Sequence, residues 1–300
     1  MIAASVTHQA SAQSKGCVLG IDAAWTAHQP SGIALVQPTA SGWHCRAVAP
    51  SYAAFLDLAT GVNLDPRARA RGSEPDPAAL LKASQALTTG GSIGCVAVDM
   101  PLATTPIVGR RAADNAISSR FGPNGCAVHS PSADRPGPIA DRLRAECSTL
   151  GYALHTNTSS PQDFPALIEV YPHVALLALL NRNYRVPYKV SRSNQYWRTE
   201  QPSRGQRIQR LLHEFQAIKA GLDAQINGIP PFIPMPEAVT TLASLKPVED
   251  MLDALICAWM GIEHLEGRTT GVGDAIAAIW VPKACCPQPT APEAGTAPPC

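Results

Sequence analysis

The sequence lacks an excess of charge of either sign. Its 300 residues include 24 lysines and arginines and 23 aspartates and glutamates, so the formal net charge is only +1. Long-range steering of a protein onto nucleic acid depends on its summed charge, and this chain has almost none. Any binding of nucleic acid must therefore come from local basic patches.

A long hydrophobic run and a signal-peptide pattern are also missing. Apolar residues make up 45% of the chain, but no uninterrupted run approaches the roughly 20 residues that span a bilayer. The segment 1–15 is rich in alanine, serine and glutamine and has no basic region leading into an apolar stretch. We therefore expect a cytoplasmic protein without a membrane partner.

The cysteines lack the paired spacing of a zinc site. Most of the nine stand singly in apolar segments, as Cys17, Cys95 and Cys257 do, where a reduced thiol behaves as a small hydrophobe. No CxxC pair with companion histidines is present. This usage agrees with a reducing cytoplasm and leaves the cysteines at the end of the chain without an assigned role.

Five segments have the apolar composition of β-strands. They cover residues 17–22, 31–36, 43–49, 95–99 and 166–171. The first three follow one another at hairpin distances and predict an antiparallel meander. The fourth is apolar until its terminal acid, as expected for a strand that is buried on both faces. The sequence therefore predicts a mixed five-stranded sheet.

Helical spacing of apolar residues occurs in three further segments. Residues 51–60 and 77–87 repeat leucine and alanine at helical distances. Pro247 stands where the first turn of a helix tolerates proline, and the residues after it form a single apolar stripe. We expect these helices to cover both faces of the sheet, which gives an α/β fold.

The predicted domain extends over residues 16–283. Two insertions, 103–165 and 181–236, interrupt it on either side of the fifth strand. The segments 1–15 and 284–300 lack hydrophobic periodicity, and we expect them to be disordered.

Four aspartates stand where a folded sheet and its last helix would bring them together. Asp22 and Asp99 end predicted strands, and Asp250 and Asp253 lie on the predicted helix after Pro247. The last two are three residues apart and therefore about 60° apart round the helix axis, so they share one face. Divalent ions held by such carboxylates shield a phosphodiester and activate water for its hydrolysis. These four residues are our catalytic candidates, with Mg²⁺ or Mn²⁺ as the cofactor.

Each acid also has a structural interpretation. Asp22 and Asp99 could accept backbone hydrogen bonds in turns, and Asp250 could complement the helix dipole. Asp253 is harder to explain in this way, because a charge inside an apolar helix is expensive unless it is paired or metal-bound. Glu169, inside an apolar strand, raises the same question, with an arginine partner as the alternative to a metal.

Several motifs, taken in order, resemble one family. They are Gly20-Ile21-Asp22-Ala23-Ala24-Trp25 with Pro30-Ser31-Gly32, Val96-Ala97-Val98-Asp99-Met100-Pro101, Gly109-Arg110-Arg111-Ala112-Ala113-Asp114, Ile168-Glu169-Val170-Tyr171-Pro172 and Glu249-Asp250-Met251-Leu252-Asp253-Ala254. The set resembles the predicted RNase H-like nucleases named domain of unknown function DUF429, over most of the chain. The resemblance implies an RNase H-like fold, in the variant used by Holliday-junction resolvases. One departure is Ala24, where many nucleases of this fold have glycine.

The resemblance also implies roles for individual acids. Asp22 and Asp99 would be strand-borne metal ligands, and Asp253 or Asp250 would complete the coordination. Glu169 would be a fourth or alternate metal ligand.

Basic residues suggest where a substrate could bind. Arg110 and Arg111 are candidates for binding substrate phosphates, because guanidinium groups bind phosphate in a bidentate way. In the segment 182–210, tyrosine and tryptophan alternate with cations that include Lys189 and Arg192. In this mixture the cations contact a nucleic-acid backbone and the aromatic rings stack on unpaired bases. The alternative for both is solvated surface. We expect DNA or RNA as the partner.

The sequence thus predicts a metal-dependent nuclease that hydrolyses phosphodiester bonds. One alternative keeps the architecture and is a nucleotide phosphotransferase or ATPase of the sugar-kinase or actin-like type. The segment Gly271-Val272-Gly273 lacks the longer glycine fingerprint that phosphate loops need, which disfavours it. A second alternative is a non-catalytic nucleic-acid-binding module, which the intact set of carboxylates disfavours.

Overall fold

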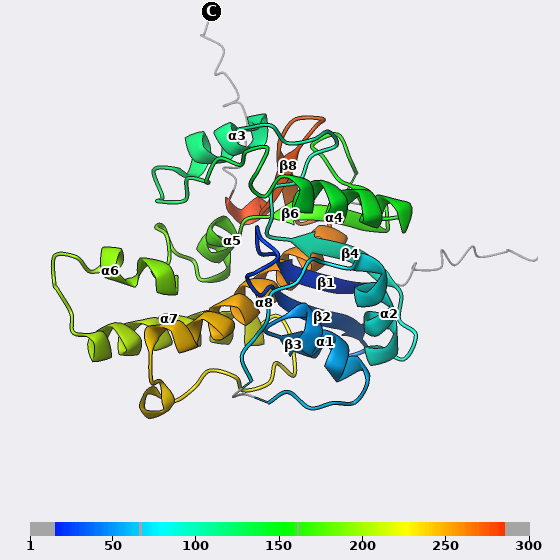
Figure 1. Ribbon diagram of the computed structural model, residues 1–300. Coiled ribbons are helices and arrows are strands. Elements are labelled where there is room, and N and C mark those ends of the chain that lie inside the picture. Colours follow the sequence, from blue (N-terminus) through cyan, green and yellow to red (C-terminus); the bar gives the residue numbers. More distant parts are fainter. Residues whose placement is uncertain (1–15, 66–67, 161, 286–300) are drawn as a thin grey trace, which may run out of the picture.

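The computed structural model describes residues 16–65, 68–160 and 162–285, which form three layers with a β-sheet in the middle (Figure 1). The segment 1–15 and most of the segment 284–300, for which we predict disorder, lie outside the described residues. Residues 284 and 285 are described and belong to a short 3-10 helix, η4 (Lys283–Cys285). None of the helices in the described ranges is long and apolar enough to cross a membrane.

The sheet has eight strands within the described residues, whereas the sequence predicts five. From one edge to the other they are β3 (Gly42–Ala49), β2 (Gly32–Thr39), β1 (Cys17–Asp22), β4 (Ile93–Val98), β6 (Ala166–Val170), β8 (Ala278–Pro282) and β7 (Thr269–Gly273), with β5 (Ala153–Leu154) also paired to β6. The first three form the predicted antiparallel meander, and β1, β4, β6 and β8 run parallel. The strand order is consistent with the RNase H-like plan.

The three additional strands are β5, β7 and β8. β5 has only two residues, and β7 includes Gly271 and Gly273, a residue type that is depleted in strands. β8 (AIWVP) is apolar but stands at the end of the predicted domain, where no further strand was expected. The prediction of five strands is therefore wrong in number, although each of the five is present.

Helices cover both faces of the sheet, as the sequence predicts. One face is covered by α8 (Lys246–Leu265), α5 (Pro172–Leu179) and α7 (Arg204–Asp223), and the other by α1 (Tyr52–Ala59), α2 (Pro77–Leu87) and α4 (Pro138–Thr149). Side chains along β1 alternate between these faces, since Val18 packs with the first group and Leu19 and Ile21 pack with the second. One further helix, α3 (Ala112–Phe121), packs against β7 and β8 at the far edge of the sheet.

The backbone of α8 lies unusually close to the sheet because glycines face it. A Cβ atom on Gly20 of β1 would lie 2.2 Å from the carbonyl oxygen of Ala254, and one on Gly32 of β2 would lie 2.0 Å from that of Asp250. Any side chain at either position would push the helix away. These two glycines therefore hold the acidic part of α8 against the end of β1.

The two insertions contain regular structure. Residues 103–165 include α3, α4 and β5, and residues 181–236 include η1 (Val190–Arg192), α6 (Ser193–Tyr196) and α7. Two further 3-10 helices, η2 (Pro236–Ala238) and η3 (Leu242–Leu245), lead into α8.

Candidate functional site

Two aspartates lie side by side at one edge of the sheet. Asp22 is the last residue of β1, and Asp99 directly follows β4. The two strands are parallel, so their carboxyl ends meet at the same edge. The backbone N–H of Asp99 donates a hydrogen bond of 2.8 Å to the carbonyl oxygen of Ile21 and fixes this arrangement.

Helix α8 brings three more acids to the same edge. Glu249, Asp250 and Asp253 lie in its first turns, and all three are almost fully buried. Asp22 and Asp99 are half-buried. We call these five residues the carboxylate cluster.

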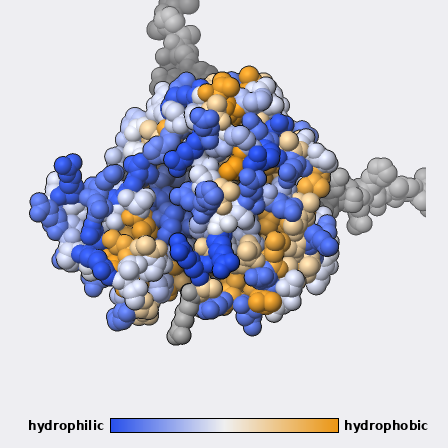
Figure 2. Space-filling model, viewed as in Figure 1, coloured by the Kyte–Doolittle hydropathy of each residue, from blue (hydrophilic) through white to orange (hydrophobic). Residues whose placement is uncertain are grey.

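A cleft of about 640 Å³ opens on one side of the cluster. Its lining includes Asp22, Asp99 and Asp250 together with Lys246, and its walls include Trp25, His129, Ser130, Arg135 and Ser191. Figure 2 shows hydrophilic residues gathered round a hollow on this face of the molecule. Three of the four predicted catalytic aspartates therefore reach a cleft that a substrate can enter.

Asp253, the fourth, lies behind this cleft and is closed off. It is 0% exposed, and the hydroxyl of Tyr188 donates a 2.5 Å hydrogen bond to its Oδ1. Its Oδ2 is paired with the ammonium of Lys189. Both oxygens that a metal would need are thus engaged within the protein.

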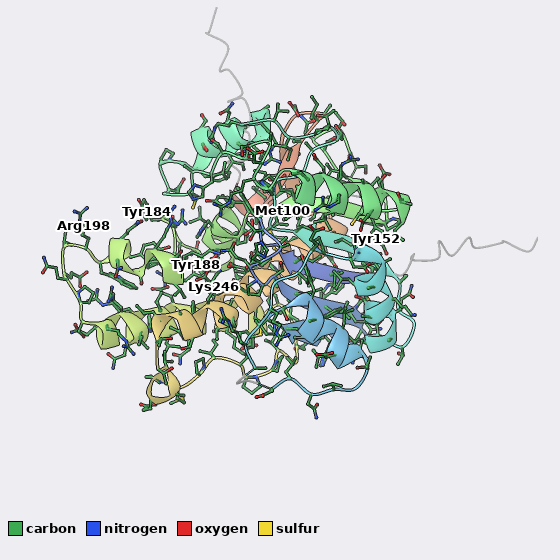
Figure 3. The ribbon with its side chains drawn as sticks, in the orientation of Figure 1. Met100, Tyr152, Tyr184, Tyr188, Arg198 and Lys246 are labelled. Atoms are coloured by element: carbon green, nitrogen blue, oxygen red, sulfur yellow. The ribbon has the colours of Figure 1, made fainter. Side chains whose placement is uncertain are left out.

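Glu249 is held in the same way, and the sequence did not single it out as a site residue. It accepts a 2.6 Å hydrogen bond from the backbone N–H of Val190 and one of 2.7 Å from Lys246, and Lys189 lies 3.5 Å away. Lys246 also pairs with Asp250. Figure 3 labels Tyr188 and Lys246, the first residue of α8; their side chains contact Asp253 and Asp250 of this helix.

Negative charge exceeds positive charge in the cluster. Among the described residues, three of its five acids, Glu249, Asp250 and Asp253, form ion pairs with two lysines, Lys189 and Lys246. Ionisation of every acid would give the five carboxylates and two lysines together a net charge of −3. The structure therefore leaves room for further positive charge, as a bound cation or as protons.

The pKa values of the acids reflect this imbalance. Burial, reinforced by the charge of Asp250, raises the pKa of Asp22 to about 7. Burial raises the pKa of Asp253 to about 6 despite Lys189, and burial together with Asp22 raises the pKa of Asp99 well above its ordinary value. Asp250 also has a raised pKa because of burial, and its buried Oδ2 has no hydrogen-bond partner among the residues that the structure describes.

Glu169 and Arg111 form a buried ion pair, which differs from the metal-ligand and phosphate-binding roles expected from the sequence. Two nitrogens of Arg111 lie 2.6 and 2.7 Å from the two oxygens of Glu169, and the N–H of Leu102 donates to Glu169 at 2.7 Å. Asp114 holds the same guanidinium at 2.6 Å. Neither residue lines the cleft. The arginine partner that we weighed for Glu169 is therefore the arrangement that the structure contains.

Arg110 also lies outside the cleft lining. Its guanidinium donates to the side chains of Asn115 at 2.7 Å, Ser130 at 2.8 Å and Ser118 at 2.6 Å. Arg110 thereby ties α3 to the loop that forms one wall of the cleft.

The remaining two predicted substrate-binding residues differ from each other. Lys189 is inside the carboxylate cluster, so its charge is directed to protein carboxylates. Arg192 is half-buried and lies 3.0 Å from Nε2 of His129, a residue of the cleft wall. Arg192 is therefore the basic residue of the segment 182–210 that we place next to the cleft.

The donor set suits a hard divalent cation, although it is not a preformed cage. Within the described ranges, no three His, Cys, Asp or Glu side chains surround one point as metal ligands would. The open members Asp22, Asp99 and Asp250 nevertheless supply only carboxylate oxygens, which Mg²⁺ and Mn²⁺ prefer. The buried Oδ2 of Asp250, which has no hydrogen-bond partner among the described residues, is a carboxylate oxygen of this kind.

Comparison with known proteins places the chain in a family. The profile of a family described as proteins of unknown function, DUF429, matches residues 20–278. The chain belongs to the DUF429 family. The DUF429 match includes the whole carboxylate cluster and extends from β1 to the first residue of β8. Searches of curated proteins and of solved structures found no match.

Proposed function

We propose that this DUF429 protein is a metal-dependent nuclease that hydrolyses phosphodiester bonds of DNA or RNA. The observation that carries the proposal is the excess of acids at the open cleft. Asp22, Asp99 and Asp250 line it, and the two lysines paired with the cluster leave most of its negative charge without a partner. Divalent Mg²⁺ or Mn²⁺ would offset this charge and is well suited to carboxylate oxygens. The strand order supports an RNase H-like fold for the domain.

The residues of the site have distinct roles in this proposal. Asp22, Asp99 and Asp250 would hold the cation, which supplies charge shielding at the phosphate and a more acidic water. Lys246 has a side chain that is 48% exposed at the cleft, so its ammonium is able to donate to a substrate phosphate oxygen. Asp253 and Glu249 would act from behind, by orienting the two lysines.

The cleft walls favour a nucleic acid over a smaller phosphodiester. The guanidinium of Arg135 lies 5.8 Å from the ring centroid of Trp25, and both residues line the cleft. An indole and an arginine are the kinds of side chain that stack bases and contact a nucleic-acid backbone. Arg192, held against His129 of the cleft wall, adds a second cation.

The direct test is cleavage of labelled single-stranded, duplex, hybrid and branched nucleic acids with Mg²⁺ or Mn²⁺. We expect metal-dependent cleavage by the wild type and a loss of at least about 100-fold in Asp22→Asn and Asp99→Asn, because each substitution removes a ligand charge. Asp57→Asn is the matched control, since Asp57 is an exposed acid on α1. It should cleave as the wild type does.

Two results would contradict the proposal. Turnover of ATP that depends on Asp22, without cleavage of any nucleic acid, would favour the phosphotransferase alternative. Binding of nucleic acid that survives Asp22→Asn and removal of metal, again without cleavage, would favour a non-catalytic binding module.

A further inference from the structure

We propose that Lys189 acts as a built-in cation of the carboxylate cluster, so that the cleft takes one divalent ion per chain and not two. This inference rests on the metal site of the proposed function. It assigns to Lys189 a positioning role in place of the substrate contact expected from the sequence.

The contacts of Lys189 point inward. Its ammonium pairs with Oδ2 of Asp253 and lies 3.5 Å from Oε1 of Glu249. Its side chain is 17% exposed, compared with 48% for Lys246 at the cleft. A substrate phosphate would therefore meet Lys246 first, while Lys189 remains among protein oxygens.

The backbone and a neighbouring hydroxyl hold Lys189 in this place. Tyr188 donates to the other oxygen of Asp253 at 2.5 Å, and the N–H of Val190 donates to Glu249 at 2.6 Å. Three consecutive residues thus attach this segment to one side of α8. Because the residues on both sides of Lys189 are held by hydrogen bonds, its side chain loses little conformational entropy when it stays in the cluster. This favours a permanent ion pair over a transient one.

The acids therefore divide into two groups. Asp253 and Glu249 are satisfied by Lys189, Lys246, Tyr188 and the backbone, and each oxygen of Asp253 already has a donor. Asp22, Asp99 and Asp250 line the cleft, and among the described residues only Asp250 of these three has a lysine partner.

A second divalent ion at the closed acids would have to displace an ammonium that already neutralises them. Like charges at such short range repel strongly where water is excluded. A compact ammonium with three donors takes the place that a second ion would need. Asp22, Asp99 and Asp250 therefore supply carboxylates for one divalent ion, whereas Asp253 and Glu249 already have Lys189 as their cation.

The test is the number of Mn²⁺ ions bound per full-length chain, measured by equilibrium dialysis. We expect one ion in the wild type and two in Lys189→Met, because that substitution removes the ammonium that neutralises Asp253 and Glu249. Lys189→Arg keeps the charge and should retain one ion. Lys219→Met is the matched control, since it removes a lysine that pairs with Asp223 on α7, and it should also bind one.

Each outcome decides the inference. Two ions in the wild type, or one ion in a folded Lys189→Met, would overturn it. If Lys189→Met does not fold, the number of Mn²⁺ ions bound by the wild type is the deciding measurement: one ion agrees with the inference and two ions overturn it. A wild type that binds no Mn²⁺ overturns the metal site and the nuclease proposal with it, whereas one bound ion without cleavage of any substrate overturns the nuclease proposal and supports the role of Lys189.

Discussion

Removing Arg111 should destabilise the protein strongly, because Glu169 would be left as a buried charge. The side chains of the two residues are 8% and 5% exposed, and breaking a buried ion pair by removing one partner costs about 3–5 kcal/mol. We expect Arg111→Met to lower the free energy of unfolding by about this amount at pH 8. Asp114 loses the same partner, which adds to the effect.

The second substitution tests the cause. Glu169→Gln in the Arg111→Met background removes the buried charge and keeps an acceptor for the N–H of Leu102. It should restore roughly half of the lost stability, since a buried neutral amide costs less than a carboxylate. Burial already raises the pKa of Glu169, and without the arginine a further rise is expected, so the deficit should be smaller at pH 5 than at pH 8.

Urea unfolding followed by circular dichroism measures these differences. The reasoning would be refuted if Arg111→Met changed the free energy of unfolding by less than about 1 kcal/mol, below the range for a broken buried pair. Weakened cleavage or binding at unchanged stability would instead assign Arg111 to substrate phosphate, the role that the sequence suggests. The double mutant separates the two cases, because it repairs a stability defect and cannot repair a lost phosphate contact.

Three further predictions concern the cluster and its position. The free energy of unfolding of the metal-free protein should fall as the pH rises from about 4 to about 7. The reason is that Asp22 keeps its proton up to a pKa of about 7 in the folded protein, whereas the unfolded chain releases it near 3.8. Urea unfolding in the presence of a chelator measures this change, and Asp22→Asn should make the free energy depend less on pH. Gly32→Ala should cost at least about 2 kcal/mol, because its Cβ would meet the backbone oxygen of Asp250 at 2.0 Å; thermal unfolding would show no shift if the helix can move away freely. Tyr188→Phe should cost about 1.5–3 kcal/mol through the lost hydrogen bond to the carboxylate of Asp253, and an unchanged urea midpoint would contradict this.

The sequence is sufficient to predict which residues approach the sheet edge. Asp22 and Asp99 end two apolar strands, and the parallel pairing of those strands follows from the order of the elements. Asp250 and Asp253 of α8 are predicted by helical spacing alone, whereas Glu249 is not. Local patterns thus predict that the four aspartates lie near one edge of the sheet, and they predict five of its eight strands within the described residues.

The division between open and closed acids depends on contacts that local patterns do not contain. Asp253 is closed by Tyr188 and Lys189, more than sixty residues earlier in the chain. Glu169 is closed by Arg111, at a sequence separation of 58. A basic segment resembles a nucleic-acid contact whether its charges point outward or toward buried acids, so composition was unable to distinguish the two.

The closed acids and the open acids also differ in what stabilises them. Asp253 and Glu169 have partners within the protein that offset part of the cost of their burial, although burial still raises the pKa of both. Asp22 and Asp99 have raised pKa values, which means that their ionised forms are held at a cost. A ligand that binds the folded state and not the unfolded chain adds stability in proportion to the logarithm of its concentration over its dissociation constant. A divalent cation at the open acids would therefore make the stability of this protein depend on its concentration, even before any substrate enters the cleft.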